Sequence, residues 1–389
     1  MRIVYADGPY SPRVSPAAVL SAAGVDGEAD VTLGWTLARQ PWIDDGSFRG
    51  TTLLAGYALS RSVDEGRVRS LPIPVSKVTA MLADDPPEIG VVTAIRRGDE
   101  LAFHRGVGWA DVLARVADRV VVEVVDGVDL GAPHVDGNVV ATIERHDRHP
   151  VSSPRQPDSI DGAIAAQVVD LMPENATLQV GVGAVPDTIA ASIDRPLHVW
   201  SGLITDAVAG LLARGLLSSP VVSAYTWGGA PIDRLYAAGM LRLESTSVTH
   251  DVGRLVQIPR LIAVNAALQV GLDGSVNVER VAGRTIAGIG GHSDFSAGAS
   301  RSPGGMSIVA LRSTDPAGRS TIVPLVDKVS TPRTDVDVVV TEHGVARLRG
   351  RSDDERAALL IGIAAPHHRD ALRADPAARP VLPAAHRTD

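Results

Sequence analysis

The 389-residue sequence contains no cysteine. This absence excludes disulfide bonds, thiolate nucleophiles and cysteine-ligated metal sites. Aromatic residues are also scarce, at 3% of the chain, so stacking platforms for nucleic-acid bases or an aromatic sugar-binding wall are not expected. The remaining composition, 45% hydrophobic and 21% charged, is that of an ordinary globular protein.

Long apolar runs and basic tracts are missing as well. No stretch of about 20 apolar residues occurs, and the first residues lack a charged leader with an apolar core, so we expect a cytoplasmic protein with no membrane partner. The net charge is -8, and the arginines form no block. A nucleic-acid partner is therefore not expected.

Short β-branched runs alternate with segments of helical periodicity, which predicts βαβ units in an α/β fold with mainly parallel sheets. Helices are predicted at residues 110–116 and 159–170. Buried strands are predicted at residues 89–95, 119–125, 177–182, 221–226, 261–265, 308–311 and 336–340. The length is sufficient for two domains with separate cores.

Residues 146–158 carry three prolines and little that could be buried, which is typical of an interdomain linker. We therefore predict an N-terminal α/β domain at residues 1–150 and a C-terminal α/β domain at residues 151–389. His146 and His149 have a spacing that metal ligands can adopt, but no third ligand follows nearby. No metal site is predicted.

The organising segment of the second half is residues 197–206. Its apolar start predicts a strand. Trp200, Ser201 and Gly202 then predict a small-residue turn, and Thr205 with Asp206 predicts the cap of a helix. Turns of this kind lie at the carboxyl ends of parallel strands, where ligands bind. Trp200, Ser201 and Gly202 themselves offer one hydroxyl but no acid or base.

Three other segments contain polar residues or glycine-rich loops that are candidates for binding or catalysis. The glycines of residues 181–183 follow a strand, and their backbone N–H groups suit a bound anion, a thioester oxyanion or a plain tight turn. Residues 283–305 are glycine-rich and predict a loop without a helix, in which His292 and Asp294 point into a pocket or support it. Glu342 and His343 follow a strand, which suits either acid–base work or a helix cap with a solvated histidine.

Four of these stretches resemble motifs of one family. Residues 178–187 read LQVGVGAVPD, residues 264–270 VNAALQV, residues 288–295 GIGGHSDF and residues 340–350 VTEHGVARLRG. They are similar to the motifs L-Q-x-G-I-G-A-I-P-[DN], I-N-x-x-[LI]-[EQ]-V, G-[VI]-G-G-Q-V-D-F and V-T-E-Y-G-[VI]-A-x-L-R-G. These belong to the acetyl-CoA hydrolase/CoA-transferase family, particularly its 4-hydroxybutyrate and acetate CoA-transferase branch, and their order and spacing agree from about residue 160 onward.

The resemblance implies two CoA-transferase-type α/β domains with the active site between them. It also implies a glutamate nucleophile that forms a glutamyl-CoA thioester, in a segment reading H-[ST]-E-M-x-S-D-G. Aligned on Asp206, this chain has Trp200 at the histidine, Ser201 at the Ser/Thr position and Gly202 at the glutamate. Glycine has no side chain, so no covalent enzyme–CoA thioester can form there.

We therefore expect an enzyme that acts on a small or medium acyl-CoA-like thioester without a glutamyl-CoA intermediate, by hydrolysis, decarboxylation or internal acyl transfer. The alternatives are an acyl-CoA:carboxylate CoA-transferase that uses another carboxylate or direct transfer, and a non-catalytic CoA-binding subunit. The predicted acid–base residues are Glu342, His292 and His343. The predicted residues for binding substrate or its oxyanion are Val182, Gly183, Trp200, Ser201, Gly202, Asn265, Gly290, Gly291 and Ser293. Coenzyme A is expected only as part of the substrate, with no tightly bound cofactor, and the family implies a homodimer or homotetramer.

Overall fold

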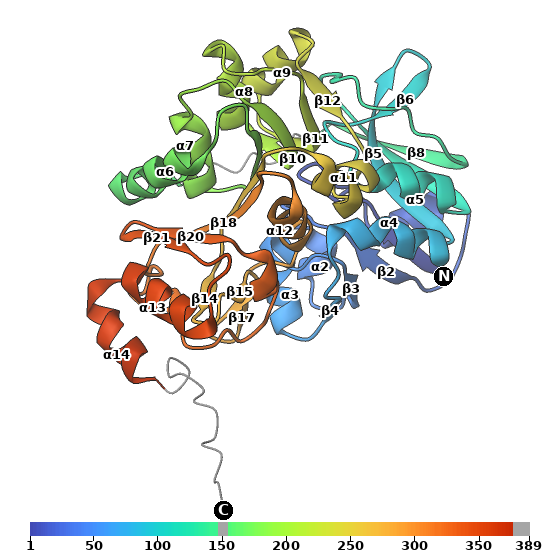
Figure 1. Cartoon of the computed structure of the whole chain (residues 1–389). Coiled ribbons are helices and arrows are strands. Elements are labelled where there is room, and N and C mark those ends of the chain that lie inside the picture. The colour runs from blue at the N-terminus through green and yellow to red at the C-terminus, as the bar shows by residue number, and fades with distance from the viewer. Residues whose placement is uncertain (147–154, 376–389) are drawn as a thin grey trace, which may run out of the picture.

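The computed structural model describes residues 1–146 and 155–375, and it contains two eight-stranded sheets flanked by helices (Figure 1). The strands of one sheet lie within residues 2–145 and those of the other within residues 177–347. The predicted α/β class with mainly parallel sheets is confirmed. The predicted domain boundary and His149 fall in residues 147–154, outside the described residues.

In the first sheet the strand order is β4-β3-β2-β1-β5-β7-β8, all parallel, and β6 pairs with β5 in the antiparallel direction. Its strands are β1 (Arg2–Tyr5), β2 (Asp30–Leu33), β3 (Gly50–Thr52), β4 (Val68–Ser70), β5 (Ile89–Arg97), β6 (Glu100–Phe103), β7 (Arg119–Val125) and β8 (Val139–Arg145). The helices of this part are α1 (Pro16–Ala22), α2 (Pro41–Asp44), α3 (Ser60–Asp64), α4 (Val75–Asp84) and α5 (Ala110–Val116).

The second sheet has the order β12-β11-β10-β9-β13-β18-β20-β21, in which only β20 and β21 are antiparallel. Its strands are β9 (Thr177–Val180), β10 (His198–Thr205), β11 (Val221–Trp227), β12 (Leu241–Leu243), β13 (Leu261–Asn265), β18 (Met306–Ala310), β20 (Val338–Thr341) and β21 (Gly344–Arg347). Small sheets are formed by β14 (Gln269–Gly271), β15 (Val276–Asn277) and β19 (Ile322–Val323), and by β16 (Arg280–Val281) with β17 (Arg284–Thr285).

The helices of the second part are α6 (Ser159–Leu171), α7 (Ala184–Ser192), α8 (Asp206–Ala213), α9 (Ala230–Ala237), α10 (Thr246–Thr249), α11 (Val252–Gln257), α12 (His292–Arg301), α13 (Asp353–Ile363) and α14 (Arg369–Ala374). None of the helices in the described ranges is long and apolar enough to cross a membrane.

The two main sheets repeat one topology. In each, the first four strands in chain order extend from the middle to one edge, and the later strands extend to the other edge. The order therefore reverses between β1 and β5 in the first sheet and between β9 and β13 in the second. Ligand crevices of open α/β sheets lie outside the carboxyl ends of strands at such switch points, so each half has one position of this kind.

Local sequence explains the main elements. Strand β7 is buried at every position but its first, as its run of valines requires for a sheet covered on both faces. Helix α6 begins with a capping box, in which Asp158 accepts from the N–H of Asp161 and the Asp161 side chain accepts from the N–H of Asp158. Arg312, which follows β18, donates to both carboxylates and ties this helix to the sheet.

Two predictions of local structure are wrong. Strand β10 runs without a turn from His198 to Thr205, so Trp200, Ser201 and Gly202 lie within a strand whose central position in the sheet outweighs the low strand propensity of glycine. Residues 292–301 form helix α12 despite their glycine and serine content. This helix packs its buried Phe295 and Ala299 against a cluster next to β13, and such tertiary packing outweighs weak helix propensity.

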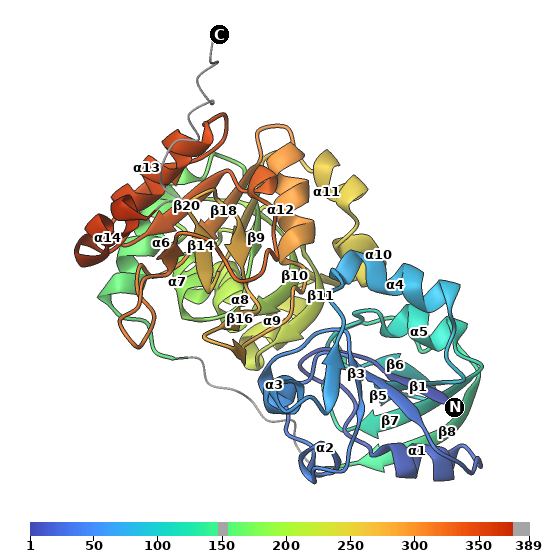
Figure 2. The ribbon, with the colours of Figure 1, turned by 90° about the horizontal axis from the view of Figure 1, so that it is seen from below.

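The two halves are joined through backbone pairing and side chains. Residues 105–107 of the first half lie along β11, where Val107 N donates to Ala224 O at 2.8 Å and Thr226 N donates to Arg105 O at 3.0 Å. Helix α10 lies beside α4 at this junction (Figure 2). The largest cluster of buried apolar residues includes members from both sheets, so the halves share one continuous core.

Candidate active site

The switch point of the second sheet brings together several of the predicted binding positions. Strand β9 pairs in parallel with both β10 and β13. Extended along the strands, these registers place three positions at the same level on neighbouring strands: Gly202 on β10, the start of the 181–183 loop after β9, and Asn265 on β13. These three positions are far apart in the sequence and adjacent in the fold.

The loop of residues 181–183 ends in a backbone conformation that favours glycine. Gly183 has φ +121° and is the N-cap of α7, a nine-residue helix. A Cβ on Gly183 would meet only a ring atom of Pro186, at 4.0 Å, so the loop borders open space. The free N–H groups at the start of α7 favour negative charge there, which suits an anionic group or a developing oxyanion.

The space beside Gly202 is filled by an imidazole. A Cβ on Gly202 would lie 2.7 Å from His250 Nε2 and 3.2 Å from a ring carbon of Phe295. A Cβ on Gly291 would lie 2.6 Å from the same nitrogen of His250. The ring of His250 is 3% exposed and therefore occupies the volume that side chains at both positions would need.

Two hydrogen bonds orient His250, which directly follows α10. Thr249 Oγ1 lies 2.9 Å from His250 Nδ1, and the same hydroxyl donates to Ser245 O at 3.2 Å. A hydroxyl has one proton to donate, so Nδ1 donates to Thr249 when that proton is directed to Ser245 O, and accepts from Thr249 when it is directed to the ring. Burial lowers the pKa of His250 to about 3, which keeps the ring neutral.

Helix α12 begins beside this histidine and carries three of the polar residues noted in the sequence. His292 Nδ1 lies 2.7 Å from Thr331 Oγ1, and burial lowers the pKa of His292 to about 4. Its Nε2 and the hydroxyl of Ser293 are buried without a hydrogen-bond partner. Asp294 accepts from Ser76 N at 3.0 Å and from Ser76 Oγ at 2.6 Å, and burial raises its pKa to about 6.

Asp294 therefore links α12 to the first turn of α4, across the two halves of the molecule. Gly290, which precedes the helix, accepts from Val75 N at 3.2 Å in the same junction. The predicted glycines 290 and 291 thus lie where the first half closes over the second.

Other predicted binding residues have their polar groups satisfied within the protein. Trp200 Nε1 donates to Thr249 O at 3.0 Å, and Ser201 Oγ donates to Val180 O at 3.0 Å. The side-chain amides of Asn265 and Gln179 exchange hydrogen bonds of 3.0 and 3.2 Å. These residues shape the end of the sheet, and Trp200 packs on the same face as Gly202, as the alternation of a strand requires.

The structure places Glu342 and His343 away from Gly202. They form the turn between β20 and β21, and β20 lies four strand positions from β10 in the sheet, a lateral separation of ~19 Å at the usual strand spacing. Glu342 accepts from Ser313 N at 2.9 Å and Ser313 Oγ at 2.6 Å, and His343 Nε2 lies 3.7 Å from Glu342 Oε1.

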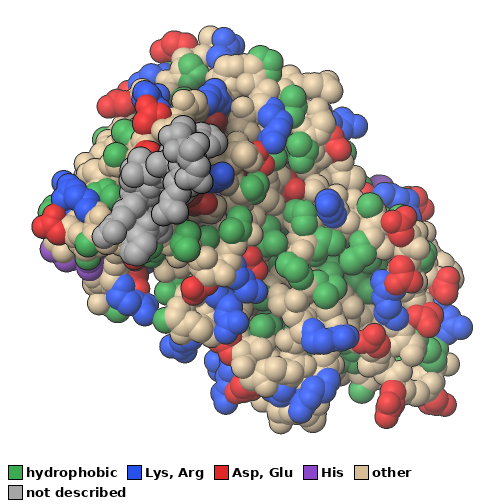
Figure 3. Space-filling view, turned by 60° about the horizontal axis from the view of Figure 1, so that its bottom comes forward, with side chains coloured by type: hydrophobic (Ala, Val, Ile, Leu, Met, Phe, Trp, Pro, Cys, Tyr) green, Lys and Arg blue, Asp and Glu red, His purple; other side chains and the backbone are tan. Residues whose placement is uncertain are grey.

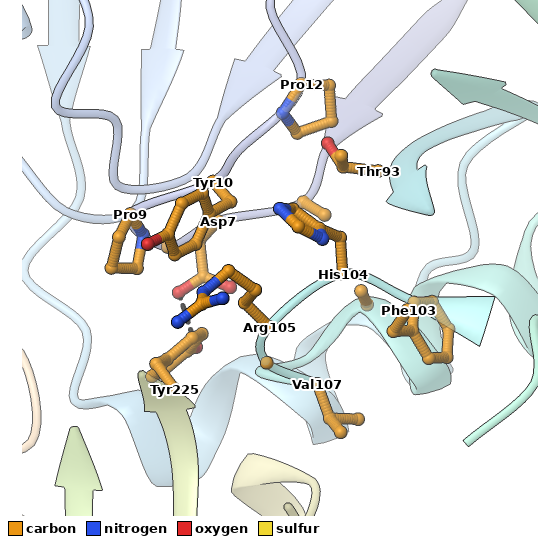
Figure 4. Close-up of a pocket in the computed structure, with 14 residues that line it drawn as sticks. Asp7, Pro9, Tyr10, Pro12, Thr93, Phe103, His104, Arg105, Val107 and Tyr225 are labelled. Carbon is orange, nitrogen blue, oxygen red and sulfur yellow. Dashed lines mark hydrogen bonds between the residues drawn. The ribbon is translucent and has the colours of Figure 1, made fainter. Parts of the chain in front are cut away.

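A second polar pocket lies at the switch point of the first sheet (Figure 4). Tyr225, at the end of β11, donates to Asp7 Oδ2 at 2.6 Å, while Oδ1 is buried without a partner. Burial raises the pKa of Asp7 to about 7. Arg105 crosses the same junction, donating to Asp233 Oδ1 at 2.9 Å and to Gly228 O at 3.0 Å.

Aromatic rings cluster next to this pocket despite their scarcity in the chain. The ring centroids of Trp35 and Tyr57 from the first half and Trp227 from the second lie 5.5 to 6.5 Å apart. Tyr57 is exposed, and the preceding Gly56 would place a Cβ 2.8 Å from the Cα of Ala287 in the loop that leads to Gly290. Hydrophobic side chains also gather near the middle of the face in Figure 3, with basic and acidic side chains around them.

Sequence reasoning missed His250, Asp7 and Tyr225. No motif marks them, because a lone histidine after a Thr-rich turn and a lone aspartate after a strand are both common. The glycine at position 202 indicated that another side chain must occupy the space beside it, but the sequence did not show which element carries that side chain. Within residues 1–146 and 155–375, no group of three or more histidine, aspartate or glutamate side chains could hold a metal ion.

Comparison with known proteins identifies the relatives of this chain. Residues 232–375 match the sequence model of the acetyl-CoA hydrolase/transferase C-terminal domain. The 4-hydroxybutyrate coenzyme A transferase of Clostridium kluyveri is 28% identical over 349 residues, which cover 84% of this chain and 81% of that protein.

Solved structures show the same architecture over nearly the whole chain. RipA from Yersinia pestis superposes with a TM-score of 0.83 at 25% identity, covering 95% of this chain and 92% of that one. A 4-hydroxybutyrate CoA-transferase from Porphyromonas gingivalis shares the fold, with a TM-score of 0.74 at 23% identity over 96% and 92% of the two chains. The C-terminal match and the transferase relative agree with the four motifs. Residues 232–375 are therefore an acetyl-CoA hydrolase/transferase C-terminal domain, and the chain is similar to CoA-transferases, which are enzymes, over most of its length.

Proposed function

We propose that this enzyme acts on a small or medium acyl-CoA thioester without forming a covalent enzyme–CoA intermediate. The observation that carries the proposal is the imidazole of His250 beside Gly202. The position at which relatives are expected to hold a glutamate has no side chain here, and its space is already filled. A nucleophilic carboxylate can neither be present nor be accommodated at position 202 unless His250 moves.

Other carboxylates around the second sheet are engaged in hydrogen bonds. Asp187 accepts from Thr205 Oγ1 at 2.7 Å, and Glu279 accepts from Ser330 Oγ at 2.8 Å. Glu342 is bonded to Ser313 at the distant β20–β21 turn. These contacts make the carboxylates structural in the resting protein and favour chemistry that does not use them as nucleophiles.

Binding of the thioester is supported by the shape and polarity of the second switch point. Val182 and Gly183 precede α7, whose free N–H groups would face the carbonyl oxygen and stabilise its charge during reaction. Gly291, at the start of α12, lies against the ring of His250, and Gly290 lies next to Leu54 of the first half. His292 and Ser293 are further polar residues at the start of α12, whereas Glu342 and His343, the acid–base groups expected from the sequence, lie at the distant β20–β21 turn.

The test is to incubate the purified protein with acetyl-, butyryl- and hexanoyl-CoA, with and without acetate, and to measure thiol release and acyl exchange. Because the chain has no cysteine, a thiol reagent reports only CoA, even at high enzyme concentration. We expect thioester turnover and no CoA adduct by intact mass or borohydride trapping. A CoA adduct on the protein would overturn the mechanism.

The same assay separates the alternatives. Turnover that requires acetate would identify a CoA-transferase working by direct transfer or through another carboxylate. Tight acyl-CoA binding without turnover would identify a CoA-binding subunit. Absence of acyl-CoA binding would overturn the proposed substrate class.

A further inference from the structure

We propose that Arg49, Arg67 and Arg69, at the amino edge of the first sheet, form a binding site for a compact phosphate group. The site is an open groove with a volume of about 540 Å³, lined by residues of β2, β3 and β4 and of the turns before them. Small-molecule sites in proteins have volumes of ~300–1,000 Å³. The proposal does not depend on the proposed function, because it concerns a different part of the molecule.

The groove lies at the edge of the first sheet opposite to its switch-point crevice. Asp30, Gly50 and Val68 are the first residues of β2, β3 and β4, which run parallel to one another. Every residue that lines the groove lies at the start of a strand or within two residues of it. Crevices for substrates lie at the carboxyl ends of such strands. A ligand in the groove therefore binds away from the reacting groups.

Strand pairing places the three arginines on one face of the sheet. Thr51 pairs with Arg69 on the neighbouring parallel strand, so their side chains point to the same face. Arg67 precedes Arg69 by two residues and Arg49 precedes Thr51 by two residues, so both share that face. Gly50 N donates to Arg67 O at 3.3 Å, which shows that the strands remain paired at this level. The arginines are therefore neighbours across β3 and β4.

Two of the guanidinium groups lack a carboxylate that would balance their charge. Arg67 Nη2 lies 2.8 Å from Glu65 Oε2, and Arg67 Nη1 donates to Ile43 O at 3.0 Å. Arg49 instead donates to backbone carbonyls of the turn before β3, and Arg69 donates to the hydroxyl of the threonine opposite it. Across residues 1–146 and 155–375, no carboxylate oxygen lies within 4.0 Å of a side-chain nitrogen of Arg49 or Arg69.

A compact anion with two charges fits this arrangement. Arg49 and Arg67 lie opposite one another, and like charges so placed destabilise a sheet unless a counter-charge binds. The Cα atoms of Arg49 and Arg69 are ~8 Å apart diagonally at the usual strand spacing and rise, within reach of one ligand for two long side chains. A phosphate group offers several oxygens and about two negative charges to the two guanidinium groups. A carboxylate would balance only one of them.

Glu28 and Asp30 line the groove on the side of β2 and limit what it accepts. Both side chains are exposed, and their charges repel an extended polyanion that reaches over β2. Gly66, in the turn before β4, would place a Cβ more than 4 Å from any neighbouring atom and so borders open space. The groove therefore favours a compact phosphate group held at the β3–β4 side.

The experiment is isothermal titration calorimetry of the full chain with sodium diphosphate. We expect one diphosphate per chain, with weaker binding at about 300 mM than at about 50 mM salt, because salt screens exposed charges. Arg49→Gln and Arg69→Gln each remove a charged donor and should weaken binding by at least ~10-fold. Asp30→Asn removes a repelling charge and should tighten binding by about 3-fold.

Arg254→Gln is the matched control. Arg254 is an exposed arginine of α11 that does not line the groove, and its substitution should leave binding within about 2-fold because distant charges are screened. Circular dichroism and thermal unfolding establish that each variant is folded. Inorganic phosphate and ADP, titrated in parallel, separate the possible sources of the phosphate group. Tighter binding of ADP than of diphosphate through the same arginines would identify a nucleotide.

The outcomes decide the proposal. Diphosphate binding that is weakened by both groove variants and not by Arg254→Gln supports it. Absence of binding to folded wild type overturns it, as does equal binding by wild type, Arg49→Gln and Arg69→Gln. Binding that survives both substitutions and is displaced by CoA would indicate an anion at the start of α7 instead, and that result also overturns the groove site.

Discussion

Replacement of Gly202 by alanine tests the packing on which the proposed function depends. The added methyl group would lie 2.7 Å from His250 Nε2 and 3.2 Å from a carbon of Phe295. The imidazole cannot retreat freely, because Gly291 and Phe295 also pack against the ring and Thr249 lies 2.9 Å from Nδ1. Overpacking of this kind costs about 1–3 kcal/mol. We therefore expect Gly202→Ala to lower the free energy of unfolding by that amount.

The measurement is urea unfolding followed by circular dichroism, arranged as a double-mutant cycle. His250→Ala removes the ring, so the methyl group at position 202 should then cost little, with a coupling of about 1–3 kcal/mol between the two sites. Gly210→Ala is the matched control, since a Cβ there, within helix α8, meets nothing within 4 Å. It should stabilise the protein by about 0.5–1 kcal/mol, the usual gain of alanine over glycine in a helix. The packing described for this site would be refuted if Gly202→Ala unfolded with the same free energy as wild type. It would also be refuted if the effects of the two substitutions on the free energy of unfolding were additive.

Three other changes give separate tests. Glu342→Gln should leave kcat for thiol release within about 3-fold of wild type, because its carboxylate is bonded to Ser313 at the distant β20–β21 turn, whereas a loss of at least ~100-fold would identify it as the general acid–base group. Because burial raises the pKa of Asp7 to about 7, folding favours its protonated form, and its stabilising contribution is lost as the pH rises from about 4 to about 7. Asp7→Asn should therefore gain stability relative to wild type between pH 5 and pH 8 in urea unfolding, and an unchanged difference would contradict this assignment. Arg105→Met removes the ion pair with Asp233 across the two halves, and we expect the free energy of unfolding to fall by about 3 kcal/mol in the same assay. No measurable fall would show that the junction does not depend on this pair.

Much of the fold was predictable because it depends on local patterns. The valine-rich run at residues 119–125 could only be satisfied in a sheet buried on both faces, and it forms β7 with the predicted bounds. Helix α5 likewise has its predicted bounds. The strand end and glycine turn at residues 181–183 were also identified, because a glycine pair between a strand and a helix is a local signal.

The errors came where packing decided between weak local preferences. Gly202 was placed in a turn, but its strand lies between β9 and β11, and hydrogen bonding on both sides extends it to Thr205. Residues 292–301 have poor helix propensity, yet the contacts of Phe295 and Asp294 with other elements stabilise α12. Neither set of contacts is visible in a local window of sequence.

The sequence by itself determined the α/β class, the succession of strands and helices, the family resemblance and the absence of a carboxylate at position 202. These follow from hydrophobic periodicity, turn chemistry and residue identity, each of which is a property of a short segment. Only the tertiary structure decided that His250 fills the space beside Gly202 and that Asp7 meets Tyr225 across the two halves. Such pairs arise from the close packing of segments that are distant along the chain, and the side chain that occupies a given volume is set by all the elements around it at once.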